Sequence, residues 1–320
     1  MISVVIPLFN KEQYVNFCIE SLYCSAMKAR VEIEVIIVDD LSTDKSVERV
    51  LSSERDVKLL RLEENKGPSY ARNFGVRHSA FDFIYFIDAD DFVDINFFSY
   101  LYHSLKLYPH DFVYVFGIQC IADGAENLNS TGSLIPSESL NSSIKHKTKY
   151  EYHRNLCSGL LFFTASSVCV RKDVFDKVGF FDEGSRYSED AEFWARLSEC
   201  YDSIVCSSKL CYYRTVENSL SQVSFKKLEH KPILLTRLFN QINKSSPKEV
   251  KEAFSLMFVK YLFLVSKNKN SNKQLIWSVD YFNNCSLPYK FYSFLIYICP
   301  SLVLARTFSM FLKFKNRRLN

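Results

Sequence analysis

The sequence predicts an α/β protein with a mostly parallel central sheet flanked by helices, followed by a helical C-terminal extension. Short apolar runs alternate with helical patterns as far as Phe116, an alternation typical of open parallel sheets. Polar clusters follow several of these runs, where such sheets bind their ligands. From Phe225 onward the pattern becomes helical. We therefore expect an α/β domain over residues 1–224 and a helical region over 225–320.

The expected strands are short apolar runs, which suit a sheet that is covered on both faces. They are Ile2–Ile6, Glu34–Val38, Val57–Leu62, Phe83–Ile87 and Phe112–Phe116. A first helix is indicated by apolar residues at helical spacing, namely Val15, Cys18, Ile19 and Leu22. A second helix is expected after Ser42 as its N-cap. A third is expected to begin at Pro68, which suits the first helical position.

Beyond the fifth strand the periodicity is weaker. Residues 121–156 are polar and rich in Ser and Asn, and we expect a long loop that is either an insertion or a lid. A helix is expected from about Asp190 to Cys200, with Ser188 as its cap. The extension carries an apolar stripe at helical spacing, formed by Val250, Ala253, Phe254, Met257, Phe258, Tyr261 and Leu262.

Composition limits the class of protein and its surroundings. The chain has 320 residues, of which 48% are hydrophobic and 24% charged, as in folded globular proteins. Its net charge of +4 gives no argument for a nucleic-acid partner. The chain begins on a strand-like run without the features of a secretory signal, and its ten cysteines include no CxxC pair. We therefore expect reduced, mostly buried cysteines and a cytoplasmic protein.

Four polar clusters stand at the ends of expected strands, and together they suit a nucleoside diphosphate. They are Ile6–Asn10, Val38–Asp44, Glu64–Asn73 and Asp88–Asp91. A carboxylate such as Asp39 can accept a hydrogen bond from a base imide, and Phe9 can stack on a base. Arg72 offers a fork to phosphate or to a base carbonyl. No GxxxxGK[ST] or GxGxxG segment occurs, which removes the main support for an ATPase or a dinucleotide dehydrogenase.

The acidic cluster at the end of the fourth strand suits a metal. Asp88 and Asp90 are separated by one small residue and can hold a hard divalent cation that also bridges phosphate oxygens. Each cluster also has an ordinary structural explanation, since acids and glycines at strand ends are common in turns and caps. The order and spacing of all four clusters favour the binding site.

A fifth polar cluster, Tyr187–Leu197, is rich in acidic residues and lies at the start of the helix expected near Asp190. Acids in a first turn complement the helix dipole, and Glu192 and Arg196 form an ordinary i, i+4 pair. Two consecutive acids, Glu189 and Asp190, also stand where a loop meets the helix. One of them is a candidate general base.

Together these motifs resemble family 2 glycosyltransferases of the GT-A fold. Five motifs occur in the family's order between Ile2 and about Ser221: Val4–Asn10, Val38–Asp44, Asn65–Asn73, Asp88–Asp91 and Glu189–Asp190. The resemblance implies an inverting enzyme of bacterial polysaccharide biosynthesis. Such an enzyme moves a sugar from a nucleoside-diphosphate sugar, usually UDP-linked, to a glycan or a lipid-linked oligosaccharide.

The resemblance also assigns roles to residues. The catalytic base is Asp190, supported by Glu189. Asp90, with Asp88, holds Mn²⁺ or Mg²⁺, and Asp88 also contacts the ribose. The remaining contacts to the nucleotide sugar come from Pro7, Phe9, Asn10, Asp39, Lys66, Gly67, Arg72 and Ala89.

The sequence departs from the family at two positions. Leu41 stands where many relatives carry Gly, so its turn must either avoid a positive φ or tolerate strain. Val216 stands where the family has a His after its Tyr-Arg pair. This difference keeps open a second hypothesis, a catalytically impaired subunit that binds nucleotide sugars. A sugar nucleotidyltransferase has less support, because the first loop lacks the glycines that hold a triphosphate.

The C-terminal segment suggests contact with a membrane surface. Its apolar run Phe291–Cys299 is broken by Pro300 and is too short to span a bilayer. After Pro300, apolar residues fall on one helical face and basic residues on the other, including Arg306 and Lys313. We expect peripheral binding to the cytoplasmic face of the membrane. The alternative is a terminal helix packed on the protein with a solvated basic tail.

Overall fold

The computed structural model describes residues 1–124, 141–158, 163–185, 188–216, 233–243, 245–266 and 285. The chain divides into two compact units. One contains Met1–Glu151 and Phe162–Glu217, and the other contains Tyr152–Leu161 and Asn218–Asn320. The predicted domain boundary at Ser224 and the predicted membrane-binding segment lie outside the described residues, so both stay predictions.

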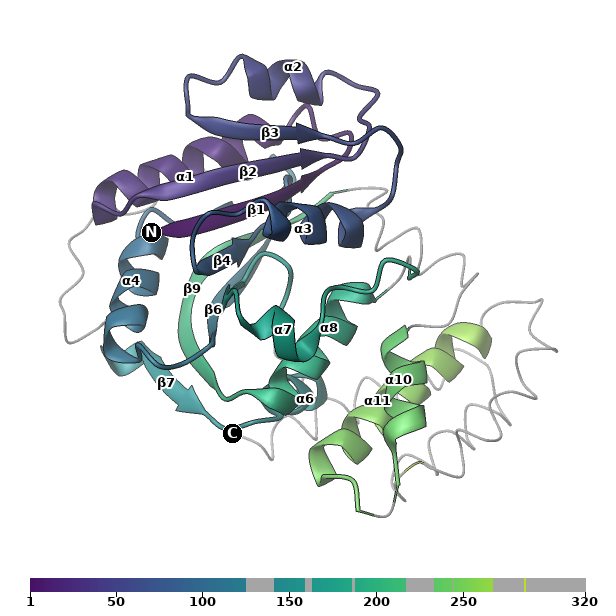
Figure 1. Cartoon of the computed structure of the whole chain (residues 1–320). Helices are drawn as coiled ribbons and strands as arrows, with labels where there is room; N and C mark the ends of the chain where they lie inside the picture. Colours follow the sequence, from purple (N-terminus) through teal and green to yellow (C-terminus); the bar gives the residue numbers. More distant parts are fainter. Residues whose placement is uncertain are drawn as a thin grey trace. The chain divides into compact units, whose positions relative to one another are not determined.

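The described part of the first unit is built around one sheet of nine strands (Figure 1). Eight of them follow the order β3-β2-β1-β4-β8-β6-β9-β5, and β7 pairs with β9. Their bounds are Ile2–Leu8 (β1), Ile33–Asp39 (β2), Val57–Arg61 (β3), Phe83–Phe86 (β4), Phe92–Val93 (β5), Val113–Ala122 (β6), Ile144–Lys147 (β7), Val168–Arg171 (β8) and Ser203–Thr215 (β9).

The N-terminal half of the sheet is parallel, as the alternation of strands and helices predicted. β1 lies between β2 and β4 and pairs in parallel with both, and β3 continues the parallel set beyond β2. β8 then runs antiparallel to its neighbours β4 and β6, whereas β6 and β9 are parallel. β5 and β7 both lie antiparallel to β9. The α/β prediction is confirmed, with a sheet that is mixed beyond β4.

Alternation along β1 directs its side chains to two different helical layers. Ile2, Val4 and Ile6 belong to the large core that includes α1 (Val15–Ala29) and α4 (Phe97–Leu107). Val5 faces the opposite way, toward α3 (Pro68–Arg77). Successive strand residues point to opposite faces, so β1 is buried on both of its faces.

The start of one helix and the cap of another differ from prediction, although α8 itself begins where it was expected. α2 spans Ser46–Leu51 and does not begin after Ser42, because the Ser42 hydroxyl instead accepts a hydrogen bond from the backbone of Asn10. α8 spans Glu189–Cys200, but Ser188 has a φ of 66° and makes no capping bond through its side chain. The start of α3 at Pro68, directly after Gly67, is confirmed.

The polar interval 121–156 is not a continuous loop where the structure describes it. It contains β7 and most of α6 (Glu151–Ser158). β7 has a single buried residue, Ile144, and so leaves little hydrophobic pattern to detect. The short helix α7 (Val174–Val178) follows β8.

The second unit is helical in its described residues, with α6, α10 (Ile233–Gln241) and α11 (Lys248–Ser266). The apolar stripe predicted for the extension lies on α11, where Val250, Ala253 and Phe254 are buried. The rings of Phe254 and Phe258 stack at 6.1 Å. Among the described residues, no helix has the length and apolar character needed to cross a membrane.

Candidate active site

The carboxyl ends of β1 and β2 are tied together by side-chain hydrogen bonds. The side-chain oxygen of Asn10 accepts from the Thr43 backbone N–H at 2.8 Å, and the Ser42 hydroxyl accepts from the Asn10 N–H at 3.1 Å. The fully buried Asp39 accepts from the Ser42 N–H at 3.1 Å through its Oδ1. Its other oxygen lies 3.4 Å from Nε of Arg61, on the neighbouring strand. The two loops therefore form one cross-linked rim.

Aromatic and aliphatic side chains project from this rim. Phe9 directly follows β1, and its side chain is 39% exposed. Pro7, near the end of the strand, is half-buried. Leu41 is 42% exposed and has a φ of 65°, while Asn10 has a φ of 52°. The turn that holds Leu41 therefore adopts the left-handed conformation, at the energetic cost that a side chain with a Cβ pays there.

The adjacent Asp40 fixes the loop that precedes α3. Its two carboxylate oxygens accept hydrogen bonds from the backbone N–H groups of Lys66 at 2.7 Å and Gly67 at 2.8 Å. Burial raises the pKa of Asp40, and these two bonds oppose the shift. Gly67 has a φ of 87°, as its place before the helix requires. The ammonium of Lys66 pairs with Glu64 at 2.9 Å.

Arg72 on α3 connects the end of β4 to the start of α8. Its side chain is 4% exposed, and its Nη2 donates to Oδ1 of Asp88 at 2.8 Å. Its Nη1 lies 3.4 Å from Oε1 of Glu189, and its guanidinium lies over the ring of Phe181 at 5.6 Å. Burial lowers the pKa of Arg72, but the charges of Asp88, Glu189 and Asp190 outweigh burial and raise it. The guanidinium therefore stays charged among these carboxylates.

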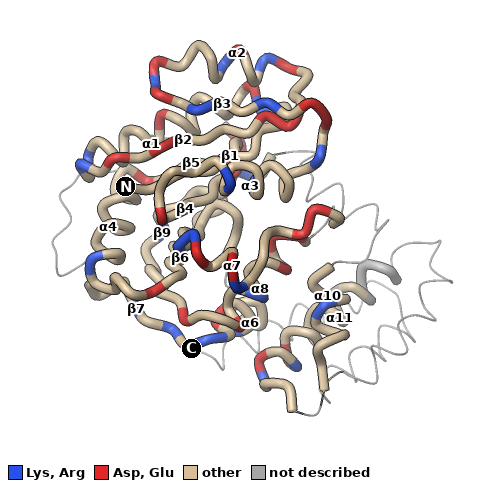
Figure 2. The backbone as a smooth tube through the Cα atoms, in the orientation of Figure 1, with Lys and Arg blue, Asp and Glu red and all other residues tan. Residues whose placement is uncertain are grey.

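Asp190 lies in the first turn of α8, beside Glu189. Figure 2 shows acidic residues in red on and near this helix. One oxygen of Asp190 accepts a hydrogen bond from the Ala191 N–H at 2.7 Å. Burial and the neighbouring charge of Glu189 raise the pKa of Asp190 to about 7, against the opposing charge of Arg72. A carboxylate with that pKa exchanges protons near neutral pH, as a general base must.

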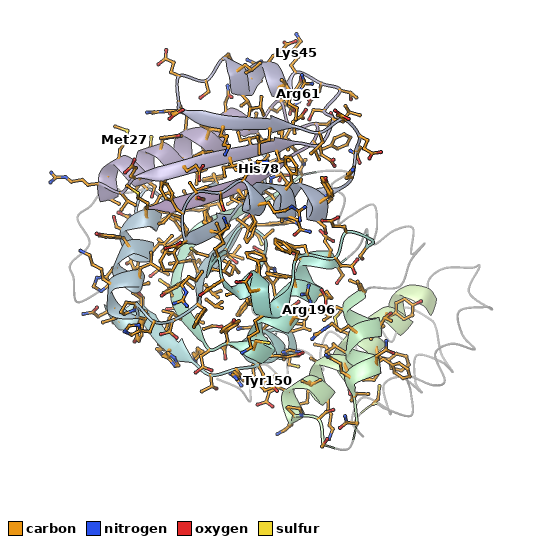
Figure 3. The ribbon with its side chains drawn as sticks, viewed as in Figure 1. Met27, Lys45, Arg61, His78, Tyr150 and Arg196 are labelled. Atoms are coloured by element: carbon orange, nitrogen blue, oxygen red, sulfur yellow. The ribbon has the colours of Figure 1, made fainter. Side chains whose placement is uncertain are left out.

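A second arginine, Arg196, lies on α8 itself and fixes the position of this helix (Figure 3). Arg196 pairs with Glu192 through two hydrogen bonds of 2.7 and 2.8 Å, which confirms the predicted i, i+4 pair. It also donates to the carbonyls of Val178, the last residue of α7, and of Phe180, in the segment after α7. Asn73 holds the same segment from α3, because its amide bonds both backbone groups of Phe181.

The acids after β4 have separate partners within the protein. Asp88 is bound by Arg72, and Asp90 Oδ2 lies 2.5 Å from the ammonium of Lys11. Ala89 between them is buried. The sequence did not single out Lys11, because a lysine after a strand is usually a surface cation.

Asp91 is a structural residue. It is 2% exposed, and it accepts hydrogen bonds from the Ser166 hydroxyl at 2.5 Å and from the Arg214 N–H at 2.9 Å. Burial, followed by the charges of Asp90 and Asp88, raises the pKa of Asp91 strongly. Asp91 therefore joins the start of β5 to the segment before β8 and to β9, and it is not directed to solvent.

The carboxylates of Asp88 and Asp90 suit a hard divalent cation. Their side chains are 31% and 16% exposed. The carboxylate of Asp90 already binds one positively charged group, the ammonium of Lys11. The described residues contain no cluster of three or more acidic, His or Cys ligands that by itself would hold a metal. Two carboxylates are nevertheless what Mg²⁺ usually takes from a protein when substrate phosphates supply other ligands.

The chain was compared with protein-family models, curated sequences and solved structures. The family model for glycosyl transferase family 2 matches residues 3–179, more than half of the chain. An uncharacterized glycosyltransferase of Haemophilus influenzae is 36% identical over 29% of this chain and 37% of its own length. The minor teichoic acid biosynthesis protein GgaA of Bacillus subtilis is 27% identical over 62% of this chain and 43% of its own. The chain thus spans less than half the length of these relatives.

Solved structures share the fold. Staphylococcus aureus TarS 1–349 in complex with UDP-GlcNAc superposes with a TM-score of 0.54 at 18% identity, over 82% of this chain and 81% of that one. The mannosyltransferase PcManGT of Pyrobaculum calidifontis, in complex with GDP-Man and Mn²⁺, gives a TM-score of 0.56 at 14% identity, over 98% and 84%. These matches confirm the predicted GT-A fold. The family model, which covers more than half of the chain, shows that this chain belongs to glycosyl transferase family 2.

Proposed function

We propose that this protein transfers a sugar, with inversion, from a UDP-linked sugar to a hydroxyl of a glycan or a lipid-linked oligosaccharide. The observation that carries the proposal is the buried Arg72, which bonds Asp88 at 2.8 Å and approaches Glu189 at 3.4 Å. One side chain thus joins the acids proposed to bind the donor to those proposed to activate the acceptor. Membership of glycosyl transferase family 2 supports the reaction class.

The donor would lie along the carboxyl ends of β1, β2 and β4. Asp39 would bind the base, with Phe9 against the ring, and Asp88 would bind the ribose. The remaining donor contacts would come from Pro7, Asn10, Lys66, Gly67, Arg72 and Ala89. The UDP-GlcNAc complex of TarS, a protein of the same fold, supports a UDP-linked donor.

Asp90 and Asp88 would hold Mn²⁺ or Mg²⁺. Such a cation, when bound, neutralises negative charge that develops on the leaving diphosphate. The Mn²⁺ complex of PcManGT supports this assignment.

Asp190 would act as the general base. It takes the proton of the acceptor hydroxyl while the hydroxyl oxygen attacks the anomeric carbon, opposite the diphosphate. The bond from that carbon to the diphosphate breaks, and its electron pair leaves with the diphosphate. Glu189 would orient the acceptor. This single displacement inverts the configuration and forms no covalent enzyme intermediate.

The test is release of UDP from a panel of UDP-sugars in the presence of Mn²⁺, with and without glycan acceptors. We expect Asp190→Asn to lower the rate of transfer by about 10²- to 10⁴-fold, the usual contribution of a general base, with donor binding retained. Asp176→Asn, at an exposed position on α7, is the matched control and should leave the rate unchanged.

Other outcomes of this assay would favour the other hypotheses. Equal rates for wild type and Asp190→Asn would remove Asp190 as the base. Donor binding without turnover by the wild type would favour a nucleotide-sugar-binding subunit, the hypothesis raised by Val216. Exchange of pyrophosphate into a sugar nucleotide would indicate a nucleotidyltransferase.

A peripheral contact with the cytoplasmic face of the membrane is part of the proposal and rests on the C-terminal sequence. GgaA, the relative named for minor teichoic acid biosynthesis, supports an acceptor of the cell surface. Flotation with vesicles of anionic phospholipid tests the contact. Substituting Arg306, Lys313 and Arg317 by Gln should abolish flotation. If the substituted chain still bound the vesicles, the proposed membrane contact would be contradicted.

A further inference from the structure

Lys11 forms an ion pair with Asp90, whose carboxylate the proposed function assigns to the divalent cation. Its Nζ lies 2.5 Å from Oδ2 of Asp90, and the two side chains are 25% and 16% exposed. The backbone of Lys11 is fixed, because its N–H donates to the Ser46 hydroxyl at 2.7 Å. Its carbonyl accepts from the N–H groups of Tyr14 and Val15 at the start of α1. The ammonium therefore reaches Asp90 from a rigid attachment point.

The partner of Asp90 differs from those of its neighbours. Arg72, the partner of Asp88, is 4% exposed and is also held by Glu189. Asp91 is bound by a hydroxyl and a backbone N–H in the interior. Lys11 is more exposed than Arg72, and its ammonium is a compact charge on a flexible stem of four carbons. Of these partners, Lys11 is the one whose charged group can swing away without opening the core.

An ammonium and a divalent cation repel each other, and a cation bound by Asp90 would compete with Lys11 for this carboxylate. We propose that Lys11 is a built-in competitor of the divalent cation, which holds Asp90 until a nucleotide donor enters. This inference rests on the proposed function, because that function brings the cation and the diphosphate to this place.

Competition of this kind couples the cation to the donor. When the cation takes Asp90, the released ammonium needs a new anionic partner, and the diphosphate of the donor supplies one. Each ligand then strengthens the binding of the other, since the coupling between two sites is reciprocal. Without a donor, the cation must displace Lys11 from Asp90 while the ammonium gains no new anionic partner. The cation therefore binds weakly.

The test is the dissociation constant of Mn²⁺ for the full chain, measured by electron paramagnetic resonance of free Mn²⁺ with and without UDP. Lys11→Met keeps the length of the side chain and removes its charge. We expect Lys11→Met to bind Mn²⁺ alone about two- to fivefold more tightly than wild type, the scale expected for losing one partly exposed ion pair. The ratio of the two dissociation constants, without and with UDP, should fall by a similar factor.

Lys45→Met is the matched control. It removes the same charge from an exposed position beside α2 (Figure 3) and should leave both constants as in wild type. An equal gain in Lys45→Met would show a general effect of charge and would overturn the proposal. Asp90→Asn should weaken Mn²⁺ binding whether or not Lys11 is present. Lys11→Gln serves as the second variant if the Met variant does not fold, as judged by thermal unfolding.

The failure of this inference differs from the failure of the proposed function. Unchanged or weaker binding of Mn²⁺ by Lys11→Met would overturn the competition and leave the transfer reaction intact. Absence of Mn²⁺ binding by both wild type and Lys11→Met would also overturn it. A chain that shows the expected gain but transfers no sugar would support the competition and contradict the proposed function.

Discussion

At the scale of single residues, Asp190 connects the geometry of the site to a measurable pH dependence. Burial and the charge of Glu189 raise its pKa to about 7, although Arg72 acts in the opposite direction. A general base works in its deprotonated form, so a raised pKa removes activity as the pH falls through that value. Asp91, which is also buried, has no such role, because both of its oxygens are bound within the protein.

We therefore expect kcat/KM for sugar transfer to rise with pH up to about 7 and then to level. Arg72→Gln removes the charge that holds the pKa of Asp190 down, so the rise should move to higher pH. Initial rates of UDP release, measured across the neutral range for both proteins, check this prediction. A wild-type rise centred near the ordinary pKa of an aspartate would contradict it.

Leu41 supplies a second test at this scale. Its φ of 65° is left-handed, as is the φ of 54° at Arg30, which ends α1. Glycine adopts this conformation without steric cost, so Leu41→Gly and Arg30→Gly should each raise the free energy of unfolding by about 0.5–1 kcal/mol. Urea unfolding measures both. Arg30→Gly is the control, because it relieves the same strain away from the site.

Several site residues could be found from sequence because their position after a strand already places them. Asp39, Asp88 and Arg72 follow from this rule, and the structure brings Asp88 and Arg72 into contact. Asp40 and Lys11 also follow strands, but the contacts that they make could not be found in this way. Their partners, the backbone of Lys66 and the side chain of Asp90, are far along the chain and meet them only after folding.

At the scale of secondary-structure elements, α3 does most to assemble the site. Arg72 reaches β4 and α8, Asn73 holds the segment after α7, and Gly75 packs on β1. A Cβ atom on Gly75 would lie 2.4 Å from Cγ1 of Val5. The start of α3 was predictable because proline suits a first helical position. The start of α2 was not, because a tertiary hydrogen bond uses the Ser42 hydroxyl.

Gly75→Ala should therefore lower the free energy of unfolding by about 1–3 kcal/mol, the usual cost of overpacking a core. Adding Val5→Ala removes the methyl group that the new Cβ meets. The double variant should then be more stable than the sum of the two single effects predicts. Urea unfolding of the four proteins checks this, and strict additivity would show that the contact does not set the position of α3.

At the scale of the whole molecule, the chain does not divide at one point. Residues Tyr152–Leu161 belong to the same compact unit as the C-terminal region. Within that unit, Arg154 lies 3.4 Å from Glu249 of α11. Alternation of strands and helices predicted the parallel half of the sheet, but it could not predict this return of α6 to the second unit. Nor could it predict the antiparallel entry of β8, which depends on pairing between distant segments.

Truncating the chain after Glu217 should therefore remove the C-terminal part of the compact unit to which α6 belongs. Buried residues such as Tyr152, His153 and Cys157 would lose partners, and Tm should fall by about 2–4 °C for each kcal/mol lost. Replacing Tyr152–Leu161 by a Gly/Ser linker of the same length in the truncated chain should restore part of the loss. Thermal unfolding of the three proteins makes the comparison, and equal Tm values would contradict it.

The cross-linked rim at the ends of β1 and β2 has a consequence for hydrogen exchange. The backbone N–H groups of Asn10, Ser42 and Thr43 donate to side-chain oxygens, although these residues lie in surface loops. Amides there should exchange with deuterium slowly, at rates nearer to those of the sheet than of open loops. Exchange measured by NMR should slow at these three positions, and Asn10→Ala should accelerate it at Thr43. The place proposed to receive the base would then be rigid before any ligand arrives.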